Sequence, residues 1–347
     1  MPNIYEVAKR AGVSTATVSR VLSRPDVVSP ETRRKVLHAV KILAYAPNSA
    51  AKHLRTLRSG KLLVTIPDLG NPFFSPILQG IEETAQSEGY AVLLGDMQHD
   101  KSREEHYGLM LQRREADGLI FFGNKLPRSV AELVAAAAPK CAPVVYGCDF
   151  EPGLGTSSVH VDNVAGGADA VDHLYALGHR RIGIVSGPPD SPSSRDRLLG
   201  ATDPERAGRA NVEFVVMKAD FSIESAYAAV NHLLGLRRPP TAIFCFNDEM
   251  AMGALEAAWG RRLRVPEDLS IVGFDDIRFA RHMNPPLTTI AQPMREIGIG
   301  TVRLLLDILS GRTIVPATVT LPHLLIVRGS TAPPAVEASL MQHASTA

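Results

Sequence analysis

The first 45 residues carry apolar side chains at the spacing that places them on one face of a helix. One stripe runs from Ile4 to Ala11, begins after the potential helix cap Asn3 and ends at Gly12, a residue type that tolerates the left-handed backbone of a helix end. Ser14 can cap a second helix after a short turn, because its hydroxyl can accept from the free amides of a first helical turn. The pattern therefore predicts two helices with helix-turn-helix spacing.

The second predicted helix has an unusual outer face. Val18, Val21 and Leu22 are expected to point inward. The side chains left facing outward are short or cationic, namely Thr15, Ala16, Thr17, Ser19 and Arg20. A solvated helix usually carries Glu and Lys, whereas short hydroxyls and arginine reach phosphates and base edges in the major groove of DNA. This face favours a DNA-binding helix over the alternative of a plain three-helix bundle.

A third helix is predicted after Ser29-Pro30-Glu31, which supplies a cap, a first-turn proline and an acid that complements the helix dipole. Its predicted buried stripe consists of Val36, Ala39, Val40 and Leu43. The head of the chain is thus expected to be small and all-α.

From Lys61 onward, short β-branched runs alternate with helical stretches. The predicted strands include residues 62–66, 92–94, 119–122, 144–146, 182–185, 242–244 and 271–274. Such alternation predicts an α/β body of parallel sheets with flanking helices. Because the pattern restarts near Val159, after the loop 151–158, we expect two doubly wound parallel-sheet lobes that bind a ligand beyond the carboxyl ends of their strands.

Polar and aromatic residues concentrate after these predicted strands. They include residues 68–74 after the first strand and, after later ones, Asp96, Asp149, 191–197, 247–248 and 275–276. These positions favour a polar cleft between the lobes. Some have structural alternatives: Phe73 and Phe74 as core residues, and Asp275 or Asp248 as helix caps, with Asp248 the better suited to capping.

Composition argues for a globular protein. Hydrophobic residues make up 45% of the chain and charged residues 21%, and no apolar run approaches the ~20 residues that a membrane span requires. The polar N-terminal stretch does not resemble a secretory signal peptide, so we expect a cytoplasmic protein with no membrane partner. The three cysteines, Cys141, Cys148 and Cys245, lack metal-ligand spacing and are expected to be buried, reduced thiols, with no metal and no cofactor.

The net charge of +1 is divided unevenly along the chain. Residues 1–61 hold 12 Lys and Arg against three acids, a net charge of +9, and the remainder hold 25 against 33, a net charge of −8. A basic head on an acidic body is typical of a polyanion-binding module attached to a domain that must not adhere to DNA. No phosphate-binding loop, nucleophile elbow or His-Glu-x-x-His motif is present, so the sequence argues against an enzyme.

The head resembles that of the lac-repressor (LacI-type) family of transcription regulators. The matching segments are Val7-Ala8, Ala11-Gly12-Val13-Ser14, Thr17-Val18-Ser19-Arg20-Val21-Leu22 and Val28-Ser29-Pro30-Glu31-Thr32-Arg33. This resemblance implies a repressor that reads double-stranded operator DNA. It implies base contacts from Thr15, Ala16 and Arg20, and phosphate contacts from Ser14, Thr17, Ser19 and Tyr45.

The same resemblance implies a hinge helix over residues 49–55, for which Asn48 is a potential cap. It implies that Leu54 is a wedge in the minor groove, with Arg55 beside it; an apolar wedge there unstacks a base step and bends the duplex. About seven residues cannot hold a helix alone in water. We therefore expect this segment to order only on DNA. A packed linker residue is the alternative for Leu54.

The body resembles the periplasmic-binding-protein-like core of the same family. The matching segments include Asn71-Pro72-Phe73-Phe74, Asn247-Asp248-Glu249-Met250-Ala251, Gly273-Phe274-Asp275 and Pro286-Leu287-Thr288-Thr289-Ile290. By this resemblance the effector-binding residues are Phe73, Phe74, Ser191, Arg197, Phe221, Asn247 and Asp275, with the rings stacking on the effector and the polar groups bonding its sugar hydroxyls. Further motifs, including Pro67-Asp68 and Gly89-Tyr90, are most similar to nucleoside-responsive members. A nucleoside effector is favoured, with other sugars left open.

One segment departs from the family pattern. After Gly200 the family continues a helix, whereas this chain has Ala201-Thr202-Asp203-Pro204, and the proline should interrupt such a helix because it removes a donor and clashes with the preceding turn. The segment 200–213 leaves open the alternative of a DNA-binding regulator that has lost its effector response. A sugar-binding transport protein is a further alternative, although it would not need the basic head.

The sequence thus predicts four regions: a helix-turn-helix head at 1–47, a hinge at 48–60, an effector-binding and dimerisation body at 61–331, and a flexible tail at 332–347. Two heads are needed to match a pseudo-palindromic operator, so we expect a homodimer. The tail lacks an apolar heptad repeat, which argues against a tetramer.

Overall fold

The computed structural model describes residues 2–45, 58–149, 155–203 and 211–335. The chain divides into two compact units, Met1–Arg58 and Ser59–Ala347. The hinge predicted at 49–55, together with Asn48, Leu54 and Arg55, lies outside the described residues, as does the tail after residue 335.

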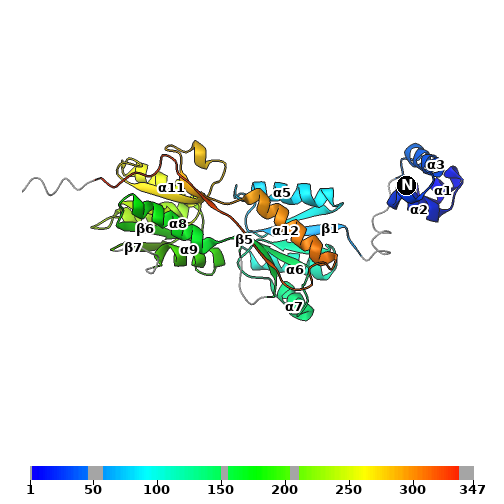
Figure 1. Cartoon of the computed structure of the whole chain (residues 1–347), viewed down its shortest axis with the longest axis horizontal. Helices are drawn as coiled ribbons and strands as arrows, with labels where there is room; N and C mark the ends of the chain where they lie inside the picture. Colours follow the sequence, from blue (N-terminus) through cyan, green and yellow to red (C-terminus); the bar gives the residue numbers. More distant parts are fainter. Residues whose placement is uncertain (1, 46–57, 150–154, 204–210, 336–347) are drawn as a thin grey trace, which may run out of the picture. The chain divides into compact units, whose positions relative to one another are not determined.

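The described part of the first unit is helical, as the sequence predicts. It consists of α1 (Ile4–Ala11), α2 (Thr15–Ser23), a 3-10 turn η1 (Pro25–Val27) and α3 (Pro30–Ile42) (Figure 1). The predicted caps are confirmed, since the side chains of Asn3, Ser14 and Ser29 each accept from the backbone amide three residues ahead. Gly12 has a φ of 64°, the left-handed backbone expected at the end of α1. The apolar stripes meet in one core of Val7, Ala8, Ala11, Val18, Val21, Val36 and Ala39.

The second unit contains two lobes, each built on a sheet that is six-stranded in the described residues. The first sheet has the order β11-β5-β4-β3-β1-β2, and all of its pairings are parallel. Its strands are β1 (Lys61–Ile66), β2 (Ala91–Asp96), β3 (Gly118–Phe121), β4 (Val144–Gly147), β5 (Ser157–Val161) and β11 (Thr318–Leu321). The helices of this lobe are α5 (Phe74–Ser87), α6 (Lys101–Gln112), α7 (Arg128–Ala137) and α12 (Met294–Leu309).

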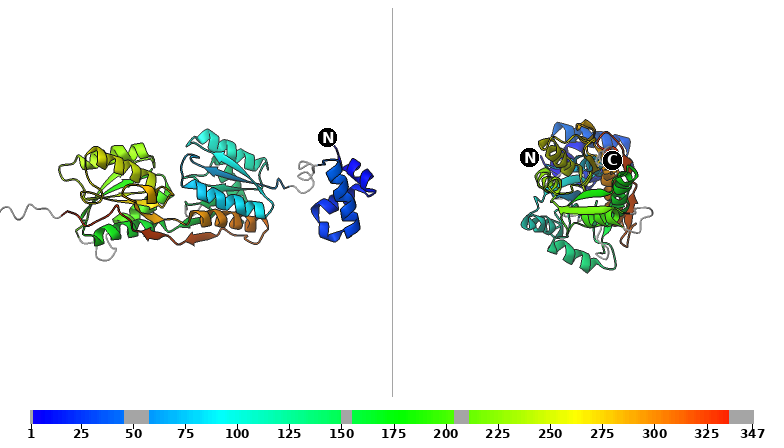
Figure 2. Two further views of the ribbon diagram at one scale, coloured as in Figure 1. Left: turned by 90° about the horizontal axis from the view of Figure 1, so that it is seen from above. Right: turned by 90° about the vertical axis from the view of Figure 1, so that its left-hand side faces the viewer.

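The sheet of the second lobe has the order β12-β10-β9-β8-β6-β7. Its strands are β6 (Arg181–Ser186), β7 (Glu213–Lys218), β8 (Ala242–Cys245), β9 (Ser270–Asp275), β10 (Thr288–Ala291) and β12 (Leu324–Ile326), and only β12 among them pairs antiparallel, with β10. The helices are α8 (Asn163–Ala176), α9 (Pro192–Thr202), α10 (Ile223–Leu234) and α11 (Asp248–Gly260), with a 3-10 turn η2 (Ala280–His282). Figure 2 shows helices on both faces of each sheet, which confirms two doubly wound lobes.

The predicted boundary between the lobes is wrong in one respect. Strand β5, which contains Val159, pairs with β4 in the first sheet, so the second lobe does not restart there. The chain enters the second lobe at α8, returns to the first lobe at α12 and β11, and crosses again to β12. Alternating apolar residues identify a strand but do not say which sheet it joins, because pairing depends on distant segments.

Helices α8 and α9 pack with their backbones in contact. A Cβ on Gly200 would lie 1.8 Å from the carbonyl oxygen of Val164, and a Cβ on Gly167 would lie 2.2 Å from that of Arg197. This close approach presses α9, and with it Arg197, against α8. Helix α9 ends at Thr202, which confirms that it stops before Pro204.

Two further expectations concern cysteines and membranes. The three cysteines are free, but only Cys245 is fully buried, whereas Cys141 and Cys148 are partly exposed. Among the helices that the structure describes, we find none with the length and apolar character needed to cross a bilayer.

Candidate functional site

The outward face of α2 is a candidate DNA interface. Ala16 and Arg20 are exposed, while Thr15, Thr17 and Ser19 are half-buried. The hydroxyls of Ser14 and Thr17 lie 2.9 Å apart at the capped start of the helix. The first turn of α2 carries no acidic residue, so the positive end of its dipole is free of a competing carboxylate. This arrangement suits a phosphate at the helix start and Arg20 reaching a base edge.

Tyr45, the other predicted phosphate contact in the described residues, follows α3. It is partly buried and packs against the core of the first unit. Its amide donates to the carbonyl of Val40. The structure thus fixes the backbone at Tyr45 to the end of the helix.

In the second unit, Arg197 is the buried centre of the candidate effector site. Only 5% of its surface is exposed. Its Nε donates to Asn163 Oδ1 at 2.8 Å, its Nη1 donates to the carbonyl oxygen of Phe246, and its guanidinium carbon lies 3.6 Å from the centroid of the Phe274 ring. Burial lowers the pKa of Arg197, while nearby Asp275 and Asp149 act in the opposite direction. The cation is thus held by an amide, a carbonyl and an aromatic face.

Asp275 ends β9 close to this arginine. Its carboxylate is 5% exposed and accepts from Gln292 Nε2 at 2.7 Å. Burial raises the pKa of Asp275 to about 7, although Arg197 and the hydrogen bond from Gln292 favour the charged form. A carboxylate in this setting can accept from ligand hydroxyls.

Asp149 joins the two lobes directly. It follows β4 in the first lobe, and its Oδ1 accepts from the backbone amide of Ser193, in the first turn of α9 in the second lobe, at 3.1 Å. Burial raises the pKa of Asp149, and the bond to Ser193 and the charge of Arg197 oppose that shift. The carboxyl therefore lies at the start of α9, the helix that Ser191 caps and that carries Arg197.

Ser191 and Asn247 both act as helix caps. Ser191 Oγ accepts from the Ser194 amide at 3.4 Å. Asn247 Oδ1 accepts from the Met250 amide at 2.8 Å, and its Nδ2 donates to the carbonyl of Phe221 at 3.1 Å. These two polar side chains hold the starts of α9 and α11 near the site.

The prediction that Asp248 caps a helix is wrong. Asn247 has the extended backbone of a cap residue, with φ −151° and ψ 171°, and Asp248 is the first residue of α11. The carboxylate of Asp248 instead accepts from the Ile277 amide and from Thr289 Oγ1. Asn247 therefore caps α11, whereas the side chain of Asp248 bonds residues outside that helix.

The three predicted aromatic residues do not form one stack. Phe73 and Phe74 are 7% and 8% exposed and belong to the main core, and their rings meet edge to face with centroids 5.2 Å apart. Phe221 is half-buried and lies over Gly187, where a Cβ would come within 2.2 Å of its ring. Phe73 and Phe74 therefore pack as core residues, which was the structural alternative to effector binding.

Two residues at the site, Asn163 and Gln292, were not predicted, and Asp149 was predicted only as one of the polar residues of the cleft. Asn163 starts α8, Gln292 follows β10, and Asp149 follows β4. A polar residue after a buried strand or at a helix start is the signal that placed Asp149 in the cleft and that could have identified the other two. The Oε1 atom of Gln292 is buried and has no hydrogen-bond partner in the described part of the chain.

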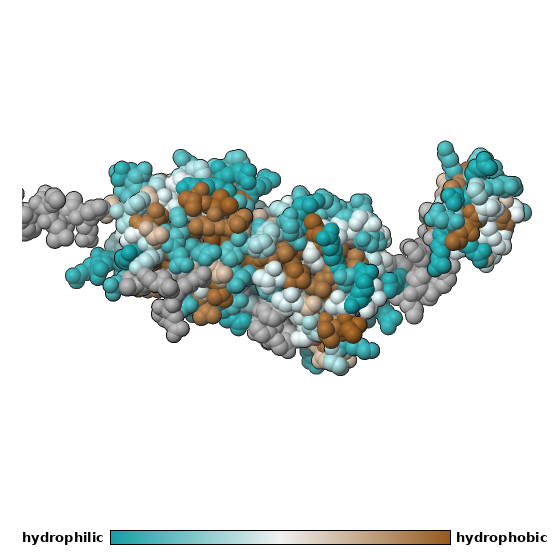
Figure 3. Space-filling view, viewed as in Figure 1, coloured by the Kyte–Doolittle hydropathy of each residue, from teal (hydrophilic) through white to brown (hydrophobic). Residues whose placement is uncertain are grey.

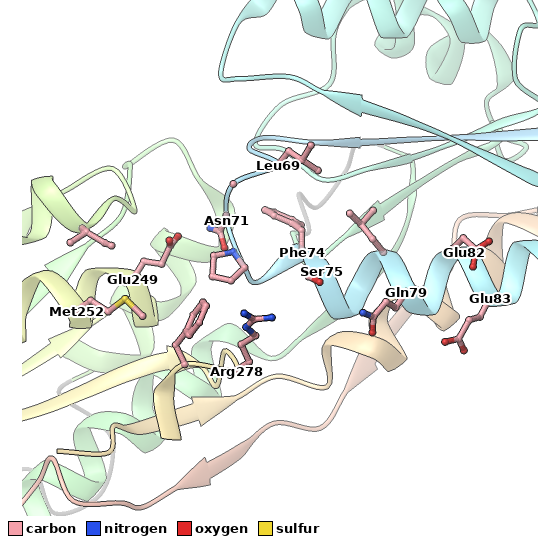
Figure 4. A pocket seen from close by; sticks show the side chains of 15 residues that line it. Leu69, Asn71, Phe74, Ser75, Gln79, Glu82, Glu83, Glu249, Met252 and Arg278 are labelled. Carbon is pink, nitrogen blue, oxygen red and sulfur yellow. The ribbon is translucent and has the colours of Figure 1, made fainter. Parts of the chain in front are cut away.

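A groove with a volume of about 810 Å³ lies between the lobes. Figure 4 shows Leu69, Asn71 and Phe74 on the side of the first lobe and Glu249, Met252 and Arg278 on the side of the second. Burial, together with the charges of Asp68 and Glu224, raises the pKa of Glu249 to about 7. None of the predicted effector residues except Phe74 lines this groove. The groove therefore offers a mixed apolar and charged surface apart from Arg197.

The residues that the structure describes include no group of three or more His, Cys, Asp or Glu side chains placed to hold a metal ion.

Two family models match the chain. Residues 3–48 match the model for bacterial regulatory proteins of the lacI family, and residues 171–331 match a periplasmic binding protein-like domain. The first match covers all of α1, α2 and α3, and the second covers most of the second lobe together with α12 and β11.

Similarity to individual proteins indicates the same family. The chain is 41% identical over 327 residues to the HTH-type transcriptional repressor CytR of Escherichia coli, covering 94% of this chain and 95% of CytR. A crystal structure of the lac repressor dimer bound to operator and the anti-inducer ONPF is 30% identical, with a TM-score of 0.84, and covers 95% of this chain and 99% of that one. A LacI family regulator from Enterococcus faecium with bound ribose is 30% identical, with a TM-score of 0.66, over 79% of this chain and 99% of that one.

The raised pKa of Asp275 predicts how the stability of the second unit depends on pH. Its folded value of about 7 lies above the ordinary 3.8, so the carboxyl contributes stability that is present below about pH 4 and is lost as the pH rises to about 7. Asp275→Asn removes this titration and keeps an oxygen that accepts from Gln292. We expect the melting temperature of the wild type to fall relative to Asp275→Asn between about pH 4 and about pH 8. A difference that is constant across this range would contradict the raised pKa.

Proposed function

Because the chain belongs to the LacI family of bacterial regulatory proteins, we propose that it is a transcriptional repressor that binds operator DNA and responds to a small effector. The observation that carries this proposal is the match to a repressor over 94% of the chain, together with a capped α2 that leaves Ala16 and Arg20 exposed. The relatives reported above are regulators rather than enzymes, and we propose the same for this chain, acting in the cytoplasm.

The DNA-binding role is assigned to the head. We propose that α2 enters the major groove, where Thr15, Ala16 and Arg20 contact bases. Phosphate contacts are assigned to Ser14, Thr17, Ser19 and Tyr45. From the family resemblance we further propose that Asn48, Leu54 and Arg55, which lie outside the described residues, belong to a hinge at 48–60 that contacts the minor groove. The basic charge of the head supports this division, because phosphate contacts supply most of the affinity for DNA.

The effector is assigned to the cluster around Arg197. The arrangement of a buried guanidinium, the Asp275 carboxylate and the free Oε1 of Gln292 supports a ligand rich in hydroxyls. The similarity to CytR and to a ribose-bound regulator favours a nucleoside. We propose that Arg197, Asn247, Asp275 and Ser191 line its polar side, and that Phe73, Phe74 and Phe221 lie on its apolar side.

We propose a homodimer that uses the groove between the lobes. Leu69 and Phe279, which line the groove, and Tyr227 on α10 are large apolar side chains with 55%, 38% and 39% of their surface exposed, and Figure 3 shows apolar patches on the surface of both lobes. Arg278 and the acidic residues of α5 line the same groove, so two copies related by a two-fold axis can bring opposite charges together. Exposed apolar side chains that gather in one place mark an interaction face, and Leu69 and Phe279 both line this groove.

We propose that the effector controls operator binding through the residues that connect the two lobes. Asp149 bonds α9 across the lobes, and Gln292, which bonds Asp275, lies where the chain returns to the first lobe. An effector that replaces one of these hydrogen bonds with a bond to itself changes the contact between the two lobes. A coupling of about 1 to 3 kcal/mol would change operator affinity by about 5- to 150-fold.

The DNA-binding assignment predicts a selective effect of Arg20→Ala. Loss of a base contact costs about 1 to 3 kcal/mol, which is a fall of about 5- to 150-fold in affinity for an operator selected from random duplexes. Affinity for unrelated DNA should change much less, since base contacts carry the specificity. Arg303→Ala, which removes an exposed cation in the body, is the control. Fluorescence anisotropy gives both affinities, and an operator affinity unchanged by Arg20→Ala would refute the assignment.

The effector assignment is tested by calorimetry against a panel that contains cytidine, other nucleosides, ribose and hexoses. We expect cytidine to bind the wild type and to bind Arg197→Lys about 10- to 150-fold more weakly, because hydrogen bonds to charged groups contribute about 1.5 to 3 kcal/mol. Arg195→Lys, at an exposed position on the same helix, should bind as the wild type does. No heat with any member of the panel would favour a regulator without effector response, and binding of a hexose alone would overturn the nucleoside.

A further inference from the structure

Asp248 has a buried carboxylate that its own helix does not use. The side chain is fully buried, with 0% of its surface exposed. Oδ2 accepts from the Ile277 amide at 2.8 Å, and Oδ1 accepts from Thr289 Oγ1 at 2.6 Å. Because Asn247 already caps α11, both bonds of Asp248 serve other segments. One segment is the turn after β9 and the other is β10.

The turn after β9 has an unfavourable backbone. Asp275 and Asp276 have φ values of 117° and 57°, a region that side-chain-bearing residues rarely adopt. Such a turn persists only when neighbouring groups hold it. Gln292 holds it on one side, since its amide donates to the Asp275 carbonyl at 3.1 Å and its Nε2 donates to the carboxylate. Asp248 holds the other side through Ile277.

The space for Asp248 depends on a glycine. A Cβ on Gly273 would lie 2.2 Å from Asp248 Oδ1, so only glycine at that position of β9 admits the carboxyl. Thr289 belongs to β10, three residues before Gln292. The carboxyl of Asp248 therefore contacts both segments that present Asp275.

We propose that Asp248 is a positioning residue that fixes the turn carrying Asp275 and thereby sets effector affinity without touching the effector. This proposal rests on the function proposed above. A purely structural role is the alternative, in which Asp248 stabilises the start of α11 through its dipole. The two accounts differ in what an uncharged residue of the same shape does.

The decisive comparison is between Asp248→Asn and Asp248→Ala. Asparagine can accept from Ile277 with Oδ1 and donate to Thr289 with Nδ2, because a hydroxyl can also accept. It replaces the carboxyl, whose pKa is raised by burial and by nearby Asp275, with a neutral amide that keeps both bonds, whereas alanine removes both. Asp268→Ala is the control, since Asp268 is an exposed carboxylate that pairs with Arg264.

The first measurement needs no effector. Hydrogen exchange of the full-length protein should be about tenfold or more faster at amides 275–279 in Asp248→Ala, as expected when local opening becomes easier. Asp248→Asn should match the wild type there. Faster exchange at α11 instead of this turn, or equal exchange in all variants, would overturn the proposal.

The second measurement uses cytidine as the probe. Affinity by calorimetry should fall about tenfold in Asp248→Ala, the effect of losing a hydrogen bond at a buried group, and should stay within about twofold in Asp248→Asn. Operator affinity without cytidine should be equal in both variants. An equal loss in both variants would show that affinity depends on the carboxyl itself rather than on its two bonds, and would contradict the proposal.

A second variant keeps the proposal testable if Asp248→Ala does not fold. Thr289→Val removes the donor to Oδ1 and leaves the carboxyl in place, so faster exchange at 275–279 is expected and unchanged exchange would contradict the proposal. If the wild type does not bind cytidine, the nucleoside assignment fails, and the exchange measurement still decides the role of Asp248.

Discussion

The body depends on keeping the guanidinium of Arg197 buried. A cation with 5% of its surface exposed loses most of its hydration, and the protein must replace that hydration with its own groups. Asn163, the Phe246 carbonyl and the face of Phe274 do so, and Asp275 and Asp149 supply the opposite charge. The contact of α8 and α9 at Gly167 and Gly200 brings Arg197 into reach of these partners. Burial of one charge thus determines the spacing of several elements.

The same constraint links the lobes. Asp149 comes from the first lobe, Arg197 from the second, and Gln292 from the segment that returns between them. Asp149 bonds Ser193, Gln292 bonds Asp275, and Arg197 bonds Asn163 and Phe246, so a ligand that replaces some of these bonds would change the balance between lobe arrangements. In the proposed mechanism, the polar groups assigned to the effector are also the groups through which its binding reaches the rest of the molecule.

Local features were predictable from the sequence and distant pairings were not. The caps Asn3, Ser14 and Ser29, the left-handed Gly12 and the end of α9 before Pro204 depend on neighbouring residues, and all were predicted. The placement of β5 in the first sheet was missed because its partner β4 is separated from it by a loop whose sequence does not specify pairing. Asp248 was misassigned because Asn and Asp cap equally well, and only the contacts with Ile277 and Thr289 separate them. The bond from Ser193 to Asp149 was likewise missed, because it joins residues of different lobes.

We propose that effector binding and operator binding are coupled in one molecule. The most direct test measures both sides of that coupling: operator affinity with and without saturating cytidine, and cytidine affinity with and without operator. We expect the two ratios to be equal and to lie between about 5 and 150. Saturating cytidine that binds the body and leaves operator affinity unchanged would contradict it.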